Sequence, residues 1–266
     1  MRLLIKHTTR YDYSAPVPYG VQQIRLSPKP TRGQVVRDWK ITVEGGQQQV
    51  EFDDHHRNHV ILFSFEPEVT QLVVRAEGVV EMSDAAGVVG VHQGLAPLWL
   101  FQKTTEHTRA GKGCRELLRR VEGDSDLEKM HDLSARIHGA IAYETGKSEI
   151  AWNAEDALAA GHGVCQDHAH VFIACARAMG LPARYVSGYL RMDGQDEQSA
   201  THAWAEAHVD GLGWVGFDVS NAISPDTRYV RVATGLDYTE AAPIVGHRYG
   251  LAEESMDVSL RVTQQQ

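Results

Sequence analysis

A change of hydrophobic periodicity near Ser125 is the feature that most constrains the fold of this 266-residue chain. Before about residue 85, short segments rich in Val, Ile and aromatic residues alternate with Pro, Gly and Asp/Asn clusters, which is typical of β-strands. From Ser125, apolar residues recur at helical spacing behind the capping-box sequence SDLE. A chain of this length can bury two cores. We therefore expect an antiparallel β-sandwich over 1–85, a linker with a helix over 86–124, and a second unit over 125–266 that ends in a strand.

The second unit combines helices with strands. After the helix at Ser125, another is expected to begin at Cys165 and to end before Gly180 and Pro182, because a glycine and a following proline commonly terminate helices. Three strand-like segments then follow, ARYVSGYL, HAWAEAHV and WVGFDVS. Because the helices precede the strands instead of alternating with them, the predicted fold class is α+β, with helices packed on an antiparallel sheet.

Charge and composition argue against several classes of protein. The chain has 26 basic and 35 acidic residues, a formal net charge of -9, and no basic stripe, so no nucleic-acid partner is expected. No segment has the roughly 18 apolar residues of a membrane span, and the apolar residues 3–5 are too few for a signal-peptide core. Three cysteines cannot form a fully paired disulfide framework. We therefore expect a cytoplasmic protein without a membrane partner.

The segment GHGVCQDHAH, residues 161–170, raises the question of what Cys165 does. Buried cysteines usually pack as small apolar residues, and we expect this of Cys114 and Cys175. Cys165 differs because its neighbours are polar and because it falls in the first turn of the expected helix. Helix N-termini favour thiolates, and thiolates are nucleophiles. The same N–H groups could hold the oxyanion that forms when the sulfur attacks a carbonyl group.

A nucleophilic cysteine needs a histidine to manage its proton and a third group to orient that histidine. His202 opens one strand and Asp218 lies near the end of the next, so hairpin pairing can bring them together. A two- or four-residue loop would put Asp218 on the wrong face. A three-residue loop over 210–212, with Gly213 as a bulge, puts Asp218 opposite Trp204 and diagonal to His202. Because only the three-residue loop brings Asp218 to the strand face of His202, we predict a three-residue loop.

Other interpretations of these residues stay open at this point. Glu206 is a rival for the orienting acid, although it is better placed as a cross-strand partner. A zinc site could draw on a cysteine and nearby histidines, although no closed set is apparent among Cys165, His162, His168 and His170. The histidines of HHRNH, residues 55–59, lack the HExxH pattern and are expected to be solvated in a loop. The chain could also be an inactive protein- or peptide-binding module.

Taken together, the segments GVCQDHAH, ARYVSGYL, THAWAEAHV and GWVGFDVSN resemble the transglutaminase-like family of the papain-like cysteine enzyme superfamily. The order Cys, His, Asp with gaps of 37 and 16 residues is similar to the compact core of that family. The segments TTRYDYSAPV and LSPKP resemble the N-terminal region of its bacterial members. The resemblance implies that Cys165 is the nucleophile, that His202 is the general base and then the general acid, and that Asp218 orients His202.

The resemblance also implies what the enzyme acts on and what it needs. It implies acyl transfer or hydrolysis at amide or peptide bonds of a protein or peptide, through an acyl-thioester. No cofactor or metal is expected, because animal relatives need calcium but nothing in this sequence matches a calcium site. His168 replaces the usual aromatic residue of the family and would add a second imidazole near the sulfur. Gln166 and Trp152 are candidates for a second oxyanion donor, and the choice between transamidation and hydrolysis stays open.

Overall fold

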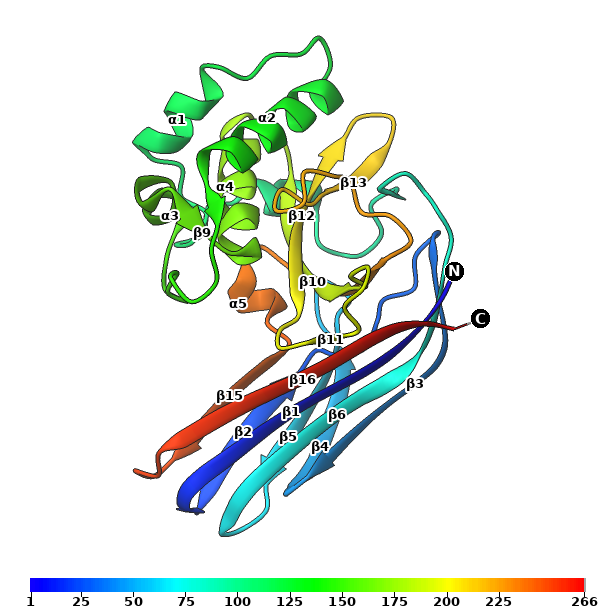
Figure 1. Ribbon diagram of the computed structural model, residues 1–266, viewed down its shortest axis with the longest axis vertical. Coiled ribbons are helices and arrows are strands. Elements are labelled where there is room, and N and C mark those ends of the chain that lie inside the picture. Colours follow the sequence, from blue (N-terminus) through cyan, green and yellow to red (C-terminus); the bar gives the residue numbers. More distant parts are fainter. Residues whose placement is uncertain (266) are drawn as a thin grey trace.

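The computed structural model describes residues 1–265, and antiparallel sheets make up most of its regular secondary structure (Figure 1). The strands are β1 (Arg2–Val17), β2 (Tyr19–Ile24), β3 (Gln34–Glu44), β4 (Gly46–Asp53), β5 (His59–Phe65), β6 (Val69–Met82), β7 (Val88–Gly90), β8 (Ala142–Tyr143), β9 (His162–Gly163), β10 (Ala183–Leu190), β11 (Glu197–Gln198), β12 (His202–Val209), β13 (Gly213–Phe217), β14 (Tyr229–Gly235), β15 (Ile244–Tyr249) and β16 (Glu254–Gln265). The helices are η1 (Leu98–Gln102), α1 (Lys112–Leu118), α2 (Asp126–Ala140), α3 (Ala154–Ala160), α4 (Cys165–Ala178) and α5 (Tyr238–Ala241). Among residues 1–265, no helix has the length and apolar character that crossing a membrane requires.

The N-terminal strands form a sandwich of two sheets, with the strand orders β11-β16-β1-β6-β3 and β15-β2-β5-β4. Side chains of β1 are alternately buried and more exposed, because successive side chains of a strand point to opposite faces. The buried side chains of both sheets share one core that includes Tyr11, Ile24, Phe63 and Leu72. The predicted β-rich N-terminal part is confirmed, and Figure 1 shows the two sheets stacked one in front of the other, below the helices.

The last two strands of the chain return to this sandwich. β16 pairs with β1 from Arg2↔Gln265 to Tyr13↔Glu254, and β15 pairs with β2. The sequence placed residues 244–265 in the second unit, and the structure corrects this assignment. The reason is that β1 and β2 would each expose an unpaired edge without these partners, and a sheet edge favours pairing. Both termini therefore lie close together (Figure 1).

The sheet of the second unit has the order β14-β10-β12-β13-β7, and α2, α3 and α4 cover one of its faces. The alanines of β12 pack against α4, with Phe172 and Phe217 stacked in the same core. The α+β fold class is confirmed, as are the capping box at Ser125 and the helix starting at Cys165. The region expected to be a linker supplies the edge strand β7 together with the predicted helix α1. Helix α3, which Asn153 caps, was not predicted.

The hairpin of β12 and β13 has the predicted three-residue loop. Val209 pairs with Gly213 and Ala205 pairs with Phe217, so three residues, 210–212, form the loop. Gly211 and Gly213 take φ values of +81° and +78°, which glycine adopts without the strain that a side chain would bring. Continuing this register by one pair places Asp218 opposite Trp204, on the strand face that also carries His202.

Candidate active site

Cys165 is the first residue of α4, and its side chain is partly exposed. The carboxylate of Asp167 accepts a hydrogen bond from the Val164 N–H at 2.7 Å, which holds the start of the helix in place. The first N–H groups of a helix have no acceptor within the helix, so positive potential surrounds the sulfur. Cys114 and Cys175 are free and fully buried. Cys165 is therefore the thiol that a molecule from solution can reach.

His202 and Asp218 form a buried pair beside this sulfur. His202 Nε2 lies 2.6 Å from Asp218 Oδ2, and the two residues are 7% and 0% exposed. Because Nε2 pairs with the carboxylate, Nδ1 is the ring nitrogen left for Cys165. Burial by itself lowers the pKa of His202, but hydrogen bonds to Asp218 and Cys165 and the charges of both groups raise it to about 10. The structure thus favours a charged imidazolium at neutral pH.

Two residues that the sequence did not single out hold the carboxylate of Asp218. Its Oδ2 accepts hydrogen bonds from Asn221 Nδ2 and from the Tyr229 hydroxyl, both at 2.7 Å. Burial raises the pKa of Asp218, but His202, Asn221 and Tyr229 together lower it below its usual value. Asn221 follows Asp218 by three residues in a turn, which a search for turn residues could have found. Tyr229 lies on β14, and no local pattern indicates it because β10 separates β14 from β12.

Glu206 takes no part in orienting His202. Its carboxylate accepts hydrogen bonds from Arg184 Nε at 2.5 Å and from Arg231 Nε at 2.7 Å. Arg184 is its cross-strand neighbour in the pairing of β10 with β12. The sequence-based preference for Glu206 as a cross-strand partner therefore agrees with the structure.

His168 lies one helical turn after Cys165, but both of its ring nitrogens have other partners. Nε2 lies 3.0 Å from the Ile141 carbonyl oxygen, and Nδ1 lies 3.1 Å from the Ser220 hydroxyl. Burial lowers the pKa of His168 although the carbonyl groups of Ile141 and Val164 oppose this effect. The imidazole therefore joins α4 to the ends of α2 and β13. A role as a second imidazole for the sulfur, as the sequence suggested, would require it to leave these partners.

The possible metal ligands of the chain gather elsewhere. Within residues 1–265, the one group of side chains close enough to hold a metal ion consists of His55, His56 and Glu240, and it does not include Cys165. His56 is buried, with Nε2 2.6 Å from Glu240 Oε2. The expectation that the histidines of residues 55–59 are all solvated is therefore wrong for His56, because α5 brings a carboxylate to it from the far end of the chain.

The two candidate oxyanion donors border the site. The side-chain amide of Gln166 donates to the Ile150 carbonyl oxygen at a long 3.5 Å, so only a weak bond holds it. Trp152 and Cys165 each pack against the edge of the helical core, and the Trp152 ring lies 5.5 Å from that of His162. Ile150 and Trp152 both belong to the loop before α3, so this loop is next to the start of α4.

Family comparisons match two parts of the chain. Residues 3–81 match the bacterial transglutaminase-like N-terminal region, and residues 115–219 match the transglutaminase-like superfamily. The chain belongs to the transglutaminase-like superfamily. All three residues that the sequence proposed for this transglutaminase-like site, Cys165, His202 and Asp218, lie inside the second match.

Individual relatives of this transglutaminase-like chain cover it to different extents. An uncharacterized protein of Mycobacterium leprae is 27% identical over 276 residues, which cover 98% of each chain. An uncharacterized protein of Mycobacterium tuberculosis is 40% identical over 147 residues, which cover 51% of this chain and 47% of that protein. The crystal structure of a proposed cysteine protease from Cytophaga hutchinsonii has a TM-score of 0.79 at 21% identity, covering 100% of this chain and 92% of that one. The last similarity establishes a common fold over the whole chain.

Proposed function

We propose that this transglutaminase-like chain is a thiol enzyme that transfers or hydrolyses acyl groups at amide or peptide bonds of a protein or peptide. Cys165 is the nucleophile, His202 is the general base and then the general acid, and Asp218 orients His202. The observation that carries the proposal is a buried imidazole, 2.6 Å from a carboxylate, beside a partly exposed cysteine at a helix N-terminus. The three cysteines are free, which fits a reducing compartment, so the proposal includes a cytoplasmic location.

The proposed reaction begins once His202, acting as the general base, has taken the proton of Cys165 and left a thiolate beside an imidazolium. The Cys165 Sγ attacks the carbonyl carbon of the substrate, a C–S bond forms, and the carbonyl electron pair moves to the oxygen. The N–H groups of the first turn of α4 are suited to hold this oxyanion. The imidazolium of His202 then gives its proton to the amide nitrogen, so the C–N bond breaks and the amine leaves. An acyl-thioester on Cys165 remains.

The second half of the reaction decides the product. His202, now neutral, takes a proton from an incoming amine or water molecule while that molecule attacks the thioester. The C–S bond breaks, the thiolate is restored, and the imidazolium forms again. An amine acceptor gives transamidation and water gives hydrolysis. Throughout this cycle the charge of Asp218 stabilises the imidazolium and fixes the plane of its ring.

A peptide library analysed by mass spectrometry, with and without an added primary amine, tests the proposal. Wild type is expected to yield cleaved, deamidated or amine-linked peptides, whereas Cys165→Ala and His202→Gln should yield none. Cys175→Ala is the matched control, because it removes a buried thiol away from the site and should leave the products unchanged. Identical product profiles for wild type and Cys165→Ala would refute the enzyme and favour the binding module.

A further inference from the structure

A cavity of about 510 Å³ lies between the sandwich and the sheet of the second unit, and the charged side chains in its lining are basic. The loop after β2, the loop between β4 and β5, and the strands β7, β10 and β14 all contribute to it. Its charged lining residues are Lys29, Arg32, Arg57, Arg184 and Arg231, with His56 beside them. Among residues 1–265, no Asp or Glu lines the cavity, although the chain carries a formal net charge of -9. The overall composition therefore does not explain this lining.

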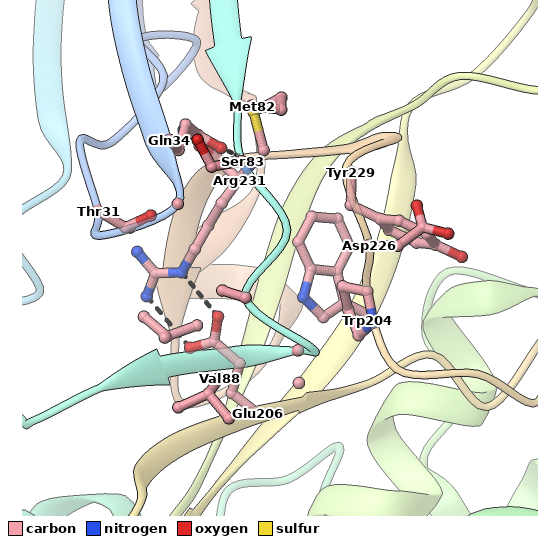
Figure 2. A pocket seen from close by; sticks show the side chains of 16 residues that line it. Thr31, Gln34, Met82, Ser83, Val88, Trp204, Glu206, Asp226, Tyr229 and Arg231 are labelled. Carbon is pink, nitrogen blue, oxygen red and sulfur yellow. Dashed lines mark hydrogen bonds and ion pairs between the residues drawn. The ribbon is translucent and has the colours of Figure 1, made fainter. Parts of the chain in front are cut away.

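The buried charges behind the cavity do not balance. Glu206 is fully buried and pairs with both Arg184 and Arg231, so one carboxylate serves two guanidinium groups. Figure 2 shows the Arg231 guanidinium directed at the Glu206 carboxylate. Lys29 adds a further cation whose partners are neutral. Its Nζ donates to the His56 carbonyl oxygen at 2.6 Å, to Asn58 Oδ1 at 3.0 Å and to Thr234 Oγ1 at 2.9 Å.

The surroundings of Lys29 make this surplus of positive charge costly. Burial, followed by the charges of Arg231 and Arg184, lowers the pKa of Lys29 well below its usual value, although Glu206 and Asp54 oppose the effect. A buried charge without a counter-charge is unfavourable, because neither water nor an ion pair replaces its lost hydration. An anion in the cavity would supply the missing counter-charge.

The lining also has the chemistry that anion recognition uses. The Arg184 guanidinium lies 3.8 Å from the centre of the Trp214 ring, which holds its plane in place. Planar guanidinium groups suit the oxygen atoms of carboxylates and phosphates. Arg32 and Arg57 are exposed at the rim, where they can attract and close over an anion. We propose that this cavity binds a small anion that carries phosphate or carboxylate groups.

The proposed anion site is separate from Cys165. His202 and Glu206 are four residues apart on β12, which corresponds to roughly 13 Å along a strand. Figure 2 shows Trp204 between the Glu206–Arg231 pair and Tyr229, which in turn bonds to Asp218. Among residues 1–265, the lining of the cavity includes none of Cys165, His202 and Asp218, so anion binding requires neither the thiol nor the imidazole. The Cys165→Ala variant should therefore bind the anion as wild type does.

Thermal unfolding and titration calorimetry with inorganic phosphate and with citrate test the proposal, each measured against sodium chloride at equal ionic strength. Wild type is expected to show a saturable rise in melting temperature and measurable heat with at least one probe. The double variant Arg32→Gln/Arg57→Gln changes only exposed rim residues and should bind about fivefold more weakly or worse. The control Lys40→Gln/Lys112→Gln removes the same charge from distant exposed sites and should bind within twofold of wild type. Comparing the two probes tells whether phosphate or carboxylate groups are preferred.

A second variant tests the charge argument itself. Lys29→Met removes the surplus cation, so the affinity for the probe should fall, while the loss of three hydrogen bonds should lower the melting temperature of the anion-free protein. The absence of any saturable effect of either probe on wild type would overturn the proposal. Equal affinities of wild type and the Arg32→Gln/Arg57→Gln variant would overturn it too, even if Lys29→Met did not fold.

Discussion

Replacing Asp218 with asparagine tests whether the carboxylate charge sustains the proposed ion pair of Cys165 and His202. The amide has nearly the same shape, and its oxygen can accept the hydrogen bonds that Tyr229 and Asn221 now give to Oδ2. The NH2 group of the new asparagine would then face the backbone N–H of Asn221, so two donors would meet. In the native protein this N–H lies 3.3 Å from Asp218 Oδ1. Because that contact is long, we expect only a modest loss of stability.

The expected effect on the ion pair follows from the pKa of His202. Raising this pKa from 6.5 to about 10 corresponds to about 5 kcal/mol in favour of the imidazolium. Asp218 and Cys165 share this stabilisation, and the substitution removes one of the two charges. We expect a loss of roughly 2 to 3 kcal/mol in the balance between the ion pair and the neutral pair. Thiolate reactivity at pH 6 should then fall by up to roughly 30- to 160-fold.

Alkylation by iodoacetamide, followed by intact-mass spectrometry, measures this effect without knowledge of the substrate. The assay is selective because Cys114 and Cys175 are buried in the native protein. Cys165→Ala should therefore take up no label, and Asp210→Asn, a carboxylate-to-amide change in the exposed hairpin loop, should react as wild type does. If folded Asp218→Asn were labelled at pH 6 within twofold of the wild-type rate, the reasoning about the ion pair would be wrong.

Three further substitutions have outcomes that the structure specifies. Tyr229→Phe removes one hydrogen bond to a buried carboxylate, so it should lower stability by about 1.5 to 3 kcal/mol and slow the labelling of Cys165 less than Asp218→Asn does. Glu206→Gln should destabilise the protein at pH 7 by about 3 to 5 kcal/mol in urea unfolding, because it leaves two buried arginines unpaired. Because the native pKa of Glu206 is lowered to about 2, its contribution is present above about pH 4.5 and lost as the pH falls toward 2, so the variant should lose less stability over that window than wild type. Gly213→Ala should lower the denaturation midpoint, with a cost of about 2 kcal/mol or more, because φ is +78° and the new Cβ would lie 2.2 Å from the Gly90 carbonyl oxygen; an unchanged midpoint would contradict the strain that we assign to this turn.

The parts of the fold that could be predicted from the sequence depend on neighbouring residues. The capping box at Ser125 and the start of α4 at Cys165 follow rules that operate within a few residues. The register that sets Asp218 opposite Trp204 follows from the length of one loop. Helix α3 was missed although Asn153 and Asp156 form a capping box, because the helix has only seven residues and little periodicity to detect.

Some residues of the candidate site are placed by neighbouring sequence, and others come from distant parts of the chain. Cys165, His202 and Asp218 could be proposed from motifs and spacing, because one helix start and one hairpin determine where they lie. Tyr229 could not, because its hydroxyl reaches Asp218 from β14, which lies three places from β13 in the sheet. The contact between His56 and Glu240 spans 184 residues of chain and depends on how the two units pack.

The α+β class, the helix that presents Cys165 and the hairpin register follow from local sequence, because dihedral preferences, caps and side-chain periodicity act over short distances. The return of the last strands to the sandwich and the hydrogen bond from Tyr229 to Asp218 follow from tertiary packing. Tertiary packing also decided that five basic side chains surround one cavity. These features depend on strand edges, buried charges and packed surfaces that exist only once distant segments meet.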